Sequence, residues 1–403
     1  MRSVEEHLQA VLELAEPLAP VQVPVRAERG MPLAEDIEAR LAVPPFDNSA
    51  MDGFAVRAAD TQAPPVRLDV IDDVPAGTAS GKELQPGQAI RIMTGSPLPL
   101  GADAIVPVEL TDQPMGDAPL PEQVEIRESV SPGRHIRHRA EDVAVGDVVL
   151  RKGADATAAA AAAAASVGHG EWRMFPRPRV LVVATGSELV APGEDLQAPG
   201  QIPDSNGLLL DGLARRFGAK VVGVLRVADD AGGFRDALEN APEADLIVTS
   251  GGVSVGAFEV VRQVTEGQVD FVTVAMQPGK PQGLGHWTVK ERKVPFLALP
   301  GNPVSVFVSA WLFLRPLVWK LSGRAPVTRL LRMPTLEGWR SPTGRRRYVP
   351  VQITADGIRR AHGLGSGSHA IGSLHLADGL AVVPADVGVV QTGDILEVLN
   401  TND

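Results

Sequence analysis

The chain has 403 residues, which suggests about two to four domains, and 44% of them are hydrophobic, too many for a disordered protein. Its formal net charge of −11 argues against a nucleic-acid binder that works by neutralising phosphates, and fits a soluble protein that handles small molecules. The sequence has no cysteine, which excludes disulfides, thiolate metal sites and cysteine nucleophiles.

The first part of the chain is predicted to be β-rich after one N-terminal helix. Apolar residues from Val4 to Ala15 follow a helical period. The acidic pair Glu5-Glu6 does not fit a signal peptide, and no window of about 18 apolar residues is present, so we expect a cytoplasmic protein with no membrane span. Short apolar runs separated by Pro and Gly then predict strands at 66–71, 89–93, 104–108 and 124–126.

A short helix separates this region from a segment of alternating strands and helices. Asp155 or Thr157 as N-cap, the run Ala158–Ala165 and the stop signal Gly168 predict that helix. From residue 178 the pattern is typical of a parallel α/β sheet covered on both faces. Strands are predicted at 180–184, 220–227, 245–248, 271–276 and 294–299, and helices at 208–217, 234–240, 259–265 and 304–321. β strands return after residue 326, at 347–353, 379–383 and 394–399.

Unusual loops follow five of the predicted central strands, and ligands bind beyond the carboxyl ends of such strands. These loops occupy residues 185–188, 229–230, 249–254, 277–281 and 300–305. Ser250-Gly251-Gly252 and the helix start at Pro303 offer backbone N–H groups to an anion, and Lys280 adds a positive charge. Each loop alone is also compatible with a structural turn or a helix cap. Their convergence on one edge favours a site for a phosphate or another oxyanion.

The carboxylate and histidine side chains indicate which kind of metal ion the chain could bind. Glu188, Asp229 and Glu259 are the kind of oxygen ligands that Mg²⁺ takes while keeping waters and bridging phosphates. The histidines lack a companion carboxylate pattern with metal-site spacing, so we expect no histidine metal site. The basic stretches 134–139 and 345–347 could bind anions, although a solvated charged face is the better default.

The ordered set of motifs resembles the MoeA and gephyrin E-domain family of molybdopterin molybdenumtransferases, and the resemblance spans essentially the whole chain. It begins with Pro45-Phe-Asp-Asn-Ser-Ala-Met-Asp-Gly-Phe-Ala55 and Ile92-Met-Thr-Gly95, and ends with Pro278-Gly-Lys-Pro281 and Leu299-Pro-Gly-Asn-Pro-Val-Ser305. Between these lie Glu141-Asp142, Ala184-Thr-Gly-Ser-Glu-Leu189, Asp204-Ser-Asn206 and Ser250-Gly-Gly-Val-Ser-Val-Gly256.

The resemblance implies a fold and an activity. The fold would be a multidomain α/β plus β protein with four parts: a helical linking domain (1–20 and 146–177), a β-rich domain (21–145), a parallel α/β molybdopterin-binding domain (178–325) and a C-terminal β-barrel (326–403). The activity would be Mg²⁺-dependent insertion of molybdate into adenylylated molybdopterin with release of AMP. An elongated homodimer is implied, with the upstream adenylyltransferase and downstream molybdoenzymes as expected protein partners.

The resemblance also implies roles for individual residues. Asp52 and Thr94 would enter the active cleft from the partner subunit, and Glu188, Asp229 and Glu259 would lie near Mg²⁺ and the substrate phosphates. Ser250, Gly251 and Gly252 would hold the pterin phosphate. Molybdate would be attracted by Lys280, Ser305, Arg345 and Ser368, and Pro300 and Pro303 would keep the last loop rigid.

Two positions depart from the family pattern, and two other functions remain open. Gln277 stands where the family often has a lysine, and Glu259 stands where it commonly has an aspartate, so the affinity for molybdate and the choice between molybdate and tungstate are in question. The alternatives are a molybdopterin adenylyltransferase and a non-catalytic molybdopterin-binding scaffold. The β-rich regions at both ends disfavour the former. Retention of Asp52, Glu188, Asp229 and Lys280 disfavours the latter.

Overall fold

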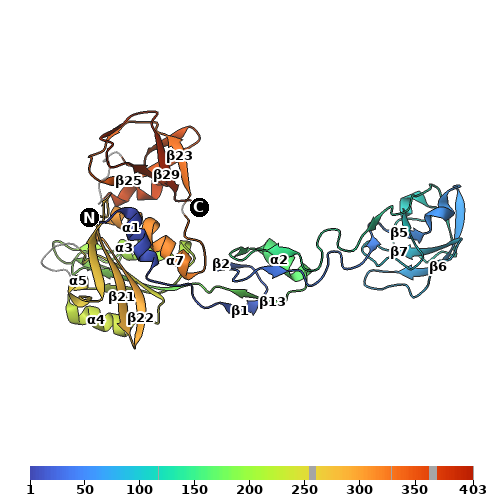
Figure 1. Cartoon of the computed structure of the whole chain (residues 1–403), viewed down its shortest axis with the longest axis horizontal. Coiled ribbons are helices and arrows are strands. Elements are labelled where there is room, and N and C mark those ends of the chain that lie inside the picture. Colours follow the sequence, from blue (N-terminus) through green and yellow to red (C-terminus); the bar gives the residue numbers. More distant parts are fainter. Residues whose placement is uncertain (117, 254–259, 328, 363–369, 403) are drawn as a thin grey trace.

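The computed structural model describes the chain except for residues 117, 254–259, 328, 363–369 and 403, and shows an elongated molecule (Figure 1). A central lobe (residues 1–20 and 178–322) carries a C-terminal lobe (326–402) beside it. A distal lobe (44–142) lies at the other end of the molecule, and a thin arm (21–43 and 143–177) joins it to the central lobe (Figure 1). The chain therefore runs out along the arm and returns along it.

The central lobe is built on a six-stranded mixed sheet. Its strands, in spatial order, are β17 (Lys220–Val227), β14 (Arg179–Thr185), β18 (Leu246–Ser250), β22 (Arg292–Leu299), β21 (Pro281–Val289) and β19 (Val269–Thr273). The first four run parallel, as predicted, but β21 is antiparallel to both neighbours, so the expectation of a purely parallel sheet is wrong. Gly283 and Gly285 weaken the apolar pattern of β21. They are needed because a Cβ at Gly285 would lie 2.2 Å from the carbonyl oxygen of Gln268.

Helices cover both faces of this sheet, which explains why β14 is apolar at almost every position. Alternate residues of β14 enter two separate cores, one with Val180 and Val182 and the other with Leu181 and Val183. The first core contains α3 (Asn206–Arg216) and the continuous helical segment α6 (Pro303–Ser309), η3 (Ala310–Leu314) and α7 (Arg315–Leu321). The second contains α4 (Ala231–Glu239) and α5 (Val260–Val264). The segment Pro303–Leu321 is long and apolar enough to cross a membrane, but 83% of it is buried, as in a core helix.

The N-terminal helix α1 (Val4–Leu12) belongs to the central lobe. Ser3 and Glu6 form a capping box at its start. Val4 and Val11 are buried in the same core as α7, and the ammonium group of Lys320 donates to the carbonyl oxygen of Leu12 at 2.8 Å. This packing differs from the expectation that residues 1–20 join residues 146–177 in a linking domain.

The arm consists mainly of antiparallel strand pairs. These are β1 (Val21–Pro24) with β13 (Glu171–Met174), β2 (Glu28–Pro32) with β12 (Asp155–Ala156), and β3 (Ile37–Glu38) with β11 (Val148–Leu150). One helix, α2 (Ala158–Ser166), covers them, with the Thr157 side chain accepting from the Ala160 N–H as predicted. The expectation of a helical linking region therefore needs correction, because residues 21–43 supply half of these strands. The alternating residues Val23 and Val25 did not predict a strand, because prolines and charged residues interrupt their apolar pattern.

The two remaining lobes are β structures. The sheet of the distal lobe has the order β8 (Ala104–Pro107), β5 (Gly53–Val56), β7 (Gln88–Ile92), β6 (Val66–Val74) and β9 (Gln123–Ile126), with β4 (Asn48–Ser49) paired to β10 (Ile136–Arg137) and short helices η1 (Ala58–Thr61) and η2 (Val108–Leu110). The C-terminal sheet has the order β20 (Met276–Gln277), β25 (Arg346–Thr354), β27 (Gly379–Val383), β29 (Ile395–Asn400) and β23 (Leu330–Pro334). β26 (Gly357–Arg360) pairs with β25, β24 (Trp339–Arg340) pairs with β28 (Val389–Val390), and η4 (Ile371–Leu376) follows. Thr335, directly after β23, forms a parallel bridge with Ile358 of β26, and the Leu336 N–H donates to the Ile358 carbonyl oxygen at 2.8 Å. The two ends of this sheet therefore meet at β26 and β23.

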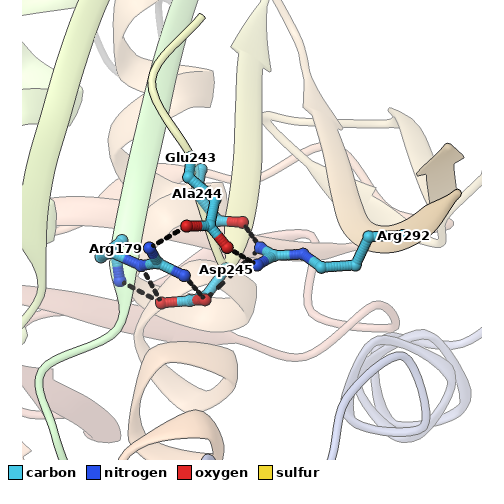
Figure 2. Close-up of polar contacts among 5 residues, drawn as sticks. All are labelled: Arg179, Glu243, Ala244, Asp245 and Arg292. Carbon is cyan, nitrogen blue, oxygen red and sulfur yellow. Dashed lines mark hydrogen bonds and ion pairs between the residues drawn. The ribbon is translucent and has the colours of Figure 1, made fainter. Parts of the chain in front are cut away.

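A charged cluster joins three strands at the amino-terminal edge of the central sheet (Figure 2). The Asp245 carboxylate accepts from the Arg179 backbone N–H at 2.9 Å and from its guanidinium at 3.0 and 2.8 Å. Glu243 pairs with both Arg179 and Arg292. We call these four residues the edge cluster. Because it lies at the edge opposite the strand-end loops, its role is in stability.

Candidate active site

The loops at the carboxyl edge of the central sheet surround one open cleft of about 820 Å³. All five loops singled out from the sequence contribute to it, and β21 brings the loop 277–281 into place because it starts directly after Lys280. Ten of the predicted site residues line the cleft: Glu188, Asp229, Ser250, Gly251, Gly252, Lys280, Pro300, Pro303, Ser305 and Arg345. The cleft therefore combines carboxylates, cations and glycine-rich backbone.

The loops after β14 and β17 are locked together by a reciprocal pair of hydrogen bonds. The Ser187 N–H donates to the Asp229 carboxylate at 3.1 Å, and the Asp229 N–H donates to the Ser187 hydroxyl at 3.0 Å. A Cβ at Gly186 would lie 2.7 Å from both carboxylate oxygens of Glu188, so glycine there leaves room for that side chain. The two carboxylates of Glu188 and Asp229 consequently face the same cleft from neighbouring strands.

The turn after β18 requires its glycines. Gly251 has φ +92°, and a Cβ there would lie 2.6 Å from the Thr185 carbonyl oxygen. Gly252 has φ +64°, and a Cβ there would lie 2.6 Å from a methyl group of Val261. The backbone can therefore turn tightly beside β14, which is the arrangement that exposes N–H groups to an anion. These contacts rule out other residues at both positions.

Two buried polar atoms beside this turn have no protein partner among the described residues. They are the hydroxyl oxygen of Ser250, a residue 2% exposed, and the side-chain oxygen of Asn206. The amide group of Asn206 donates to the Gly301 carbonyl oxygen at 2.6 Å, which ties α3 to the loop before α6. Buried polar groups are normally paired, so atoms left over at a cleft indicate a ligand or ordered water.

A buried glutamine supports the loop that carries Lys280 through two hydrogen bonds. The side chain of Gln282, a residue 1% exposed, donates to the Gly279 carbonyl oxygen at 2.7 Å and to the Ser309 hydroxyl at 2.8 Å. Lys280 itself is exposed. The guanidinium of Arg345, from the C-terminal lobe, donates to the Gln277 side-chain oxygen at 3.2 Å. Gln277 thus accepts from a second cation at the position where the resemblance suggests a lysine.

Asp52 and Thr94 lie in the distal lobe and not in this cleft. They line a separate cavity of about 580 Å³. The Asp52 carboxylate accepts from the N–H and the hydroxyl of Thr94, both at 2.7 Å. These hydrogen bonds hold the pKa of Asp52 below its usual value, so the carboxylate is ionised at neutral pH. Within one chain the arm separates these residues from the central cleft (Figure 1).

Glu259 and Ser368 lie outside the described residues. No group of three acidic or histidine residues suited to a metal occurs in the part of the chain that the structure describes. Glu188, Asp204 and Asp229 line the cleft, and Glu188 and Asp229 are the two predicted to hold a metal. That donor set fits Mg²⁺, which takes one or two protein carboxylates and completes its coordination with waters and substrate phosphates.

Three polar residues of the site received no role from the sequence, although two of them, Asp204 and Asn206, belong to a motif of the family resemblance. Asn206 and Asp204 line the cleft, and Asp204 accepts from the Gly207 N–H at 2.9 Å near the start of α3. The Asp-Ser-Asn sequence before an apolar helix is a capping signal that also marks a strand-end loop. No sequence pattern pointed to Gln282, because it is a single glutamine in β21, a strand that was not predicted.

Comparisons with known proteins cover almost the whole chain. Three family models match it: the MoeA N-terminal region (domain I and II) over residues 2–168, the probable molybdopterin binding domain over 181–320, and the MoeA C-terminal region (domain IV) over 332–400. Two Mycobacterium tuberculosis proteins named molybdopterin molybdenumtransferase 2 and molybdopterin molybdenumtransferase 1 are 43% and 33% identical; the alignments cover 99% of this chain and 99% and 98% of those proteins.

A solved structure agrees with these sequence matches. The crystal structure of the molybdopterin biosynthesis MoeA protein from Pyrococcus horikoshii is 31% identical, covers 99% of this chain and 98% of its own, and superposes with a TM-score of 0.82. The likeness extends through the three lobes and the arm, and not only the α/β core. On the family models, the full-length identity and the shared architecture, this chain belongs to the MoeA family.

Proposed function

We propose that the chain is a molybdopterin molybdenumtransferase, which inserts molybdate into adenylylated molybdopterin with Mg²⁺ and releases AMP. The observation that supports this best is the single cleft, which is lined by the glycine turn after β18, by the carboxylates of Glu188 and Asp229 and by the cations of Lys280 and Arg345. Such a site suits a substrate with several phosphates and a second, separate oxyanion. The full-length relatives named for this reaction support the same conclusion.

Positioning and charge neutralisation account for the chemistry. The turn Ser250-Gly251-Gly252 would hold the pterin phosphate through the Ser250 hydroxyl and the Gly252 N–H, while the Gly251 N–H fixes the turn by donating to the Leu299 carbonyl oxygen at 3.1 Å. Glu188 and Asp229 would hold Mg²⁺, which when bound supplies charge neutralisation at the phosphoanhydride. Lys280 and Arg345 would attract molybdate, as would Ser305 from the buried start of α6 and Ser368.

No protein nucleophile is expected in this scheme. The chain has no cysteine, and the sulfur that receives molybdenum belongs to the pterin substrate. Pro300 and Pro303 would keep the loop before α6 in place, and Glu259 would add a third carboxylate near the phosphates. The protein's contribution is then to bring the two substrates together at the correct distance.

The distal lobe would complete the site of a second copy. Asp52 and Thr94 are oriented by their mutual hydrogen bonds but lie far along the arm from their own cleft. An elongated homodimer would bring each distal lobe to the partner's central cleft. We include this homodimer, a cytoplasmic location, and contacts with an upstream adenylyltransferase and downstream molybdoenzymes in the proposal. A division into four domains is also part of it, with residues 1–20 in the α/β domain and residues 21–43 in the linking domain.

The test is AMP release from adenylylated molybdopterin in the presence of Mg²⁺ and molybdate. Replacing Lys280 or Asp52 with alanine should lower the rate about a hundredfold, the scale typical of losing one preorganised electrostatic group. Lys293→Ala and Asp69→Ala, exposed residues of the central and distal lobes, are matched controls that should leave the rate unchanged. Unchanged rates in both site variants would refute the assignment of these residues.

A parallel incubation with ATP and unmodified molybdopterin separates the alternative functions. Formation of adenylylated product would instead favour an adenylyltransferase. Binding of molybdopterin without turnover in either assay would favour a non-catalytic scaffold. The transferase proposal requires molybdate-dependent AMP release and no adenylylation.

A further inference from the structure

The side chain of Asn206 lies in the wall of the cleft, at the start of α3. Its amide group donates to the carbonyl oxygen of Gly301 at 2.6 Å, and its side-chain oxygen is buried with no protein partner in the described part of the chain. The hydrogen bond fixes which end of the amide faces Gly301, because the opposite orientation would set two oxygen atoms against each other. The oxygen of Asn206 is therefore held in place as an unpaired acceptor.

The contact with Gly301 brings Asn206 close to the glycine turn after β18. A Cβ at Gly301 would lie 3.5 Å from the Cα atom of Gly251, so the loop before α6 packs directly against that turn. Ser250 alternates along β18 with Val248, which is buried in the core that contains α3. The side chain of Ser250 therefore points to the α3 side of the sheet. The unpaired oxygen of Asn206 and the unpaired hydroxyl of Ser250 thus lie on the same side of the sheet, at neighbouring loops.

An amide oxygen restricts the kind of group that can lie against it. It repels the oxygens of a phosphate or of molybdate, which are acceptors themselves, and it accepts only from an N–H or O–H donor. A ligand that filled the cleft and left this buried acceptor unpaired would bind less tightly, since the acceptor would lose its contact with water. Asn206 therefore indicates a part of the ligand that is neither of the two oxyanions.

We propose that Asn206 is a specificity residue, whose side-chain oxygen accepts a hydrogen bond from an N–H group of the pterin ring. This inference rests on the proposed function, in which the turn at Ser250 holds the pterin phosphate. The ring system joined to that phosphate is then the part of the substrate nearest to Asn206, and its ring nitrogens and amino group supply N–H donors. An oxygen of the ligand at the same place would be rejected, so the contact selects both the pterin and its orientation.

The nucleoside half of the adenylylated substrate is another source of donors. Its ribose hydroxyls and adenine amino group would also match an amide oxygen, but they lie beyond the second phosphate and so farther from the turn at Ser250. The pterin assignment therefore requires that binding of molybdopterin, and not of AMP, depends on Asn206. These two ligands carry one half of the substrate each and separate the two sources.

Equilibrium binding of molybdopterin and of AMP to the full chain, measured separately under anaerobic, reducing conditions, tests this assignment. Asn206→Ala should weaken molybdopterin binding about tenfold, the effect of one neutral hydrogen bond and equivalent to about 1.4 kcal/mol. Its affinity for AMP should stay unchanged, which would also show that the variant is folded and that the Gly301 loop keeps its place. Asn240→Ala is the matched control, because the Asn240 amide donates to the Asp236 carbonyl oxygen at 2.9 Å on α4 and does not line the cleft. Both affinities of that control should equal those of the unmodified chain.

Three results would overturn the inference. Equal affinity for molybdopterin in Asn206→Ala and the unmodified chain would mean that water serves the acceptor. An equal loss for molybdopterin and AMP would mean that Asn206 only supports the loop, and a loss for AMP alone would give the contact to the nucleoside. Because these measurements record binding without turnover, Asn206-dependent binding of molybdopterin with no AMP release from the adenylylated substrate would count against the proposed function alone.

Discussion

The edge cluster offers the sharpest prediction on stability. Asp245 accepts three hydrogen bonds from Arg179, and its side chain is 11% exposed, against 33% for that of Arg179. A hydrogen bond to a charged group contributes about 1.5–3 kcal/mol, and breaking a fully buried ion pair costs about 3–5 kcal/mol. Because Arg179 is partly solvated, we expect Asp245→Ala to lower the free energy of unfolding of the central lobe by about 2–3 kcal/mol.

Urea unfolding and hydrogen exchange would measure this loss. With a slope of about 2–3 kcal/mol per molar urea, the midpoint of the central-lobe transition should fall by about 1 M. Since a multidomain chain need not unfold in one step, hydrogen exchange of peptides from β14 and β18 would assign the change to the central sheet. Glu243→Ala is the control from the same cluster, because the Glu243 side chain is 66% exposed and should contribute little. An unchanged midpoint in Asp245→Ala would refute the reasoning.

The same carboxylate predicts the direction of a pH effect. Burial by itself would raise the pKa of Asp245, but the hydrogen bonds and charge of Arg179 outweigh it, so the pKa lies below its usual value. A carboxylate with a lowered pKa in the folded state adds stability at neutral pH, and that contribution is lost as the pH falls below about 4. The difference between the unmodified chain and Asp245→Ala should therefore shrink in acid. A constant difference from pH 7 to 3 would contradict this origin.

Three further predictions concern the site and α1. Gly251→Ala should abolish AMP release without unfolding the chain, since its Cβ would lie 2.6 Å from the Thr185 carbonyl oxygen. The control, Gly232→Ala on α4, should leave AMP release unchanged. Gln282→Leu leaves two acceptors without their donor and should raise the KM for molybdate; an unchanged KM would show that the Lys280 loop needs no such support. Burial, and secondarily the charge of Arg2, lowers the pKa of His7 to about 4. The folded state therefore resists protonation of His7, and the free energy of unfolding should fall by up to about 3 kcal/mol between pH 6.5 and 4. In urea titrations, His7→Phe should remove that pH dependence.

The candidate site could be predicted in large part because its pattern is local. Each loop follows an apolar strand, and parallel strands must present their carboxyl ends at one edge. Ser250, Gly251 and Gly252 illustrate this, since a buried strand leads directly into glycines that only a tight turn explains. Short polar sequences at the ends of strands therefore predicted ten residues that the structure brings together in one cleft.

The parts that escaped prediction depend on contacts between distant segments. β21 was not predicted because Gly283 and Gly285 interrupt the apolar pattern of a strand, whereas in the structure they permit close approach of β19 and β22. The strands of the arm are two to five residues long, and each finds its partner more than 100 positions away. α1 packs against α7 through Val11, in the core of the central lobe. The amphipathic pattern of α1 predicts a buried face but does not say which domain covers it.

The double passage of the chain through the arm makes the distal lobe an insertion. At its base Val43 and Val143 lie opposite each other, with the Val43 N–H donating to the Val143 carbonyl oxygen at 2.9 Å. Residues 44–142 could thus be excised and the ends joined by a short turn, with the central and C-terminal lobes left intact. In the proposed homodimer, mixing such a shortened chain with a Lys280→Ala chain should restore turnover by complementation in trans, because the shortened copy would supply the intact cleft and the other copy the distal lobe.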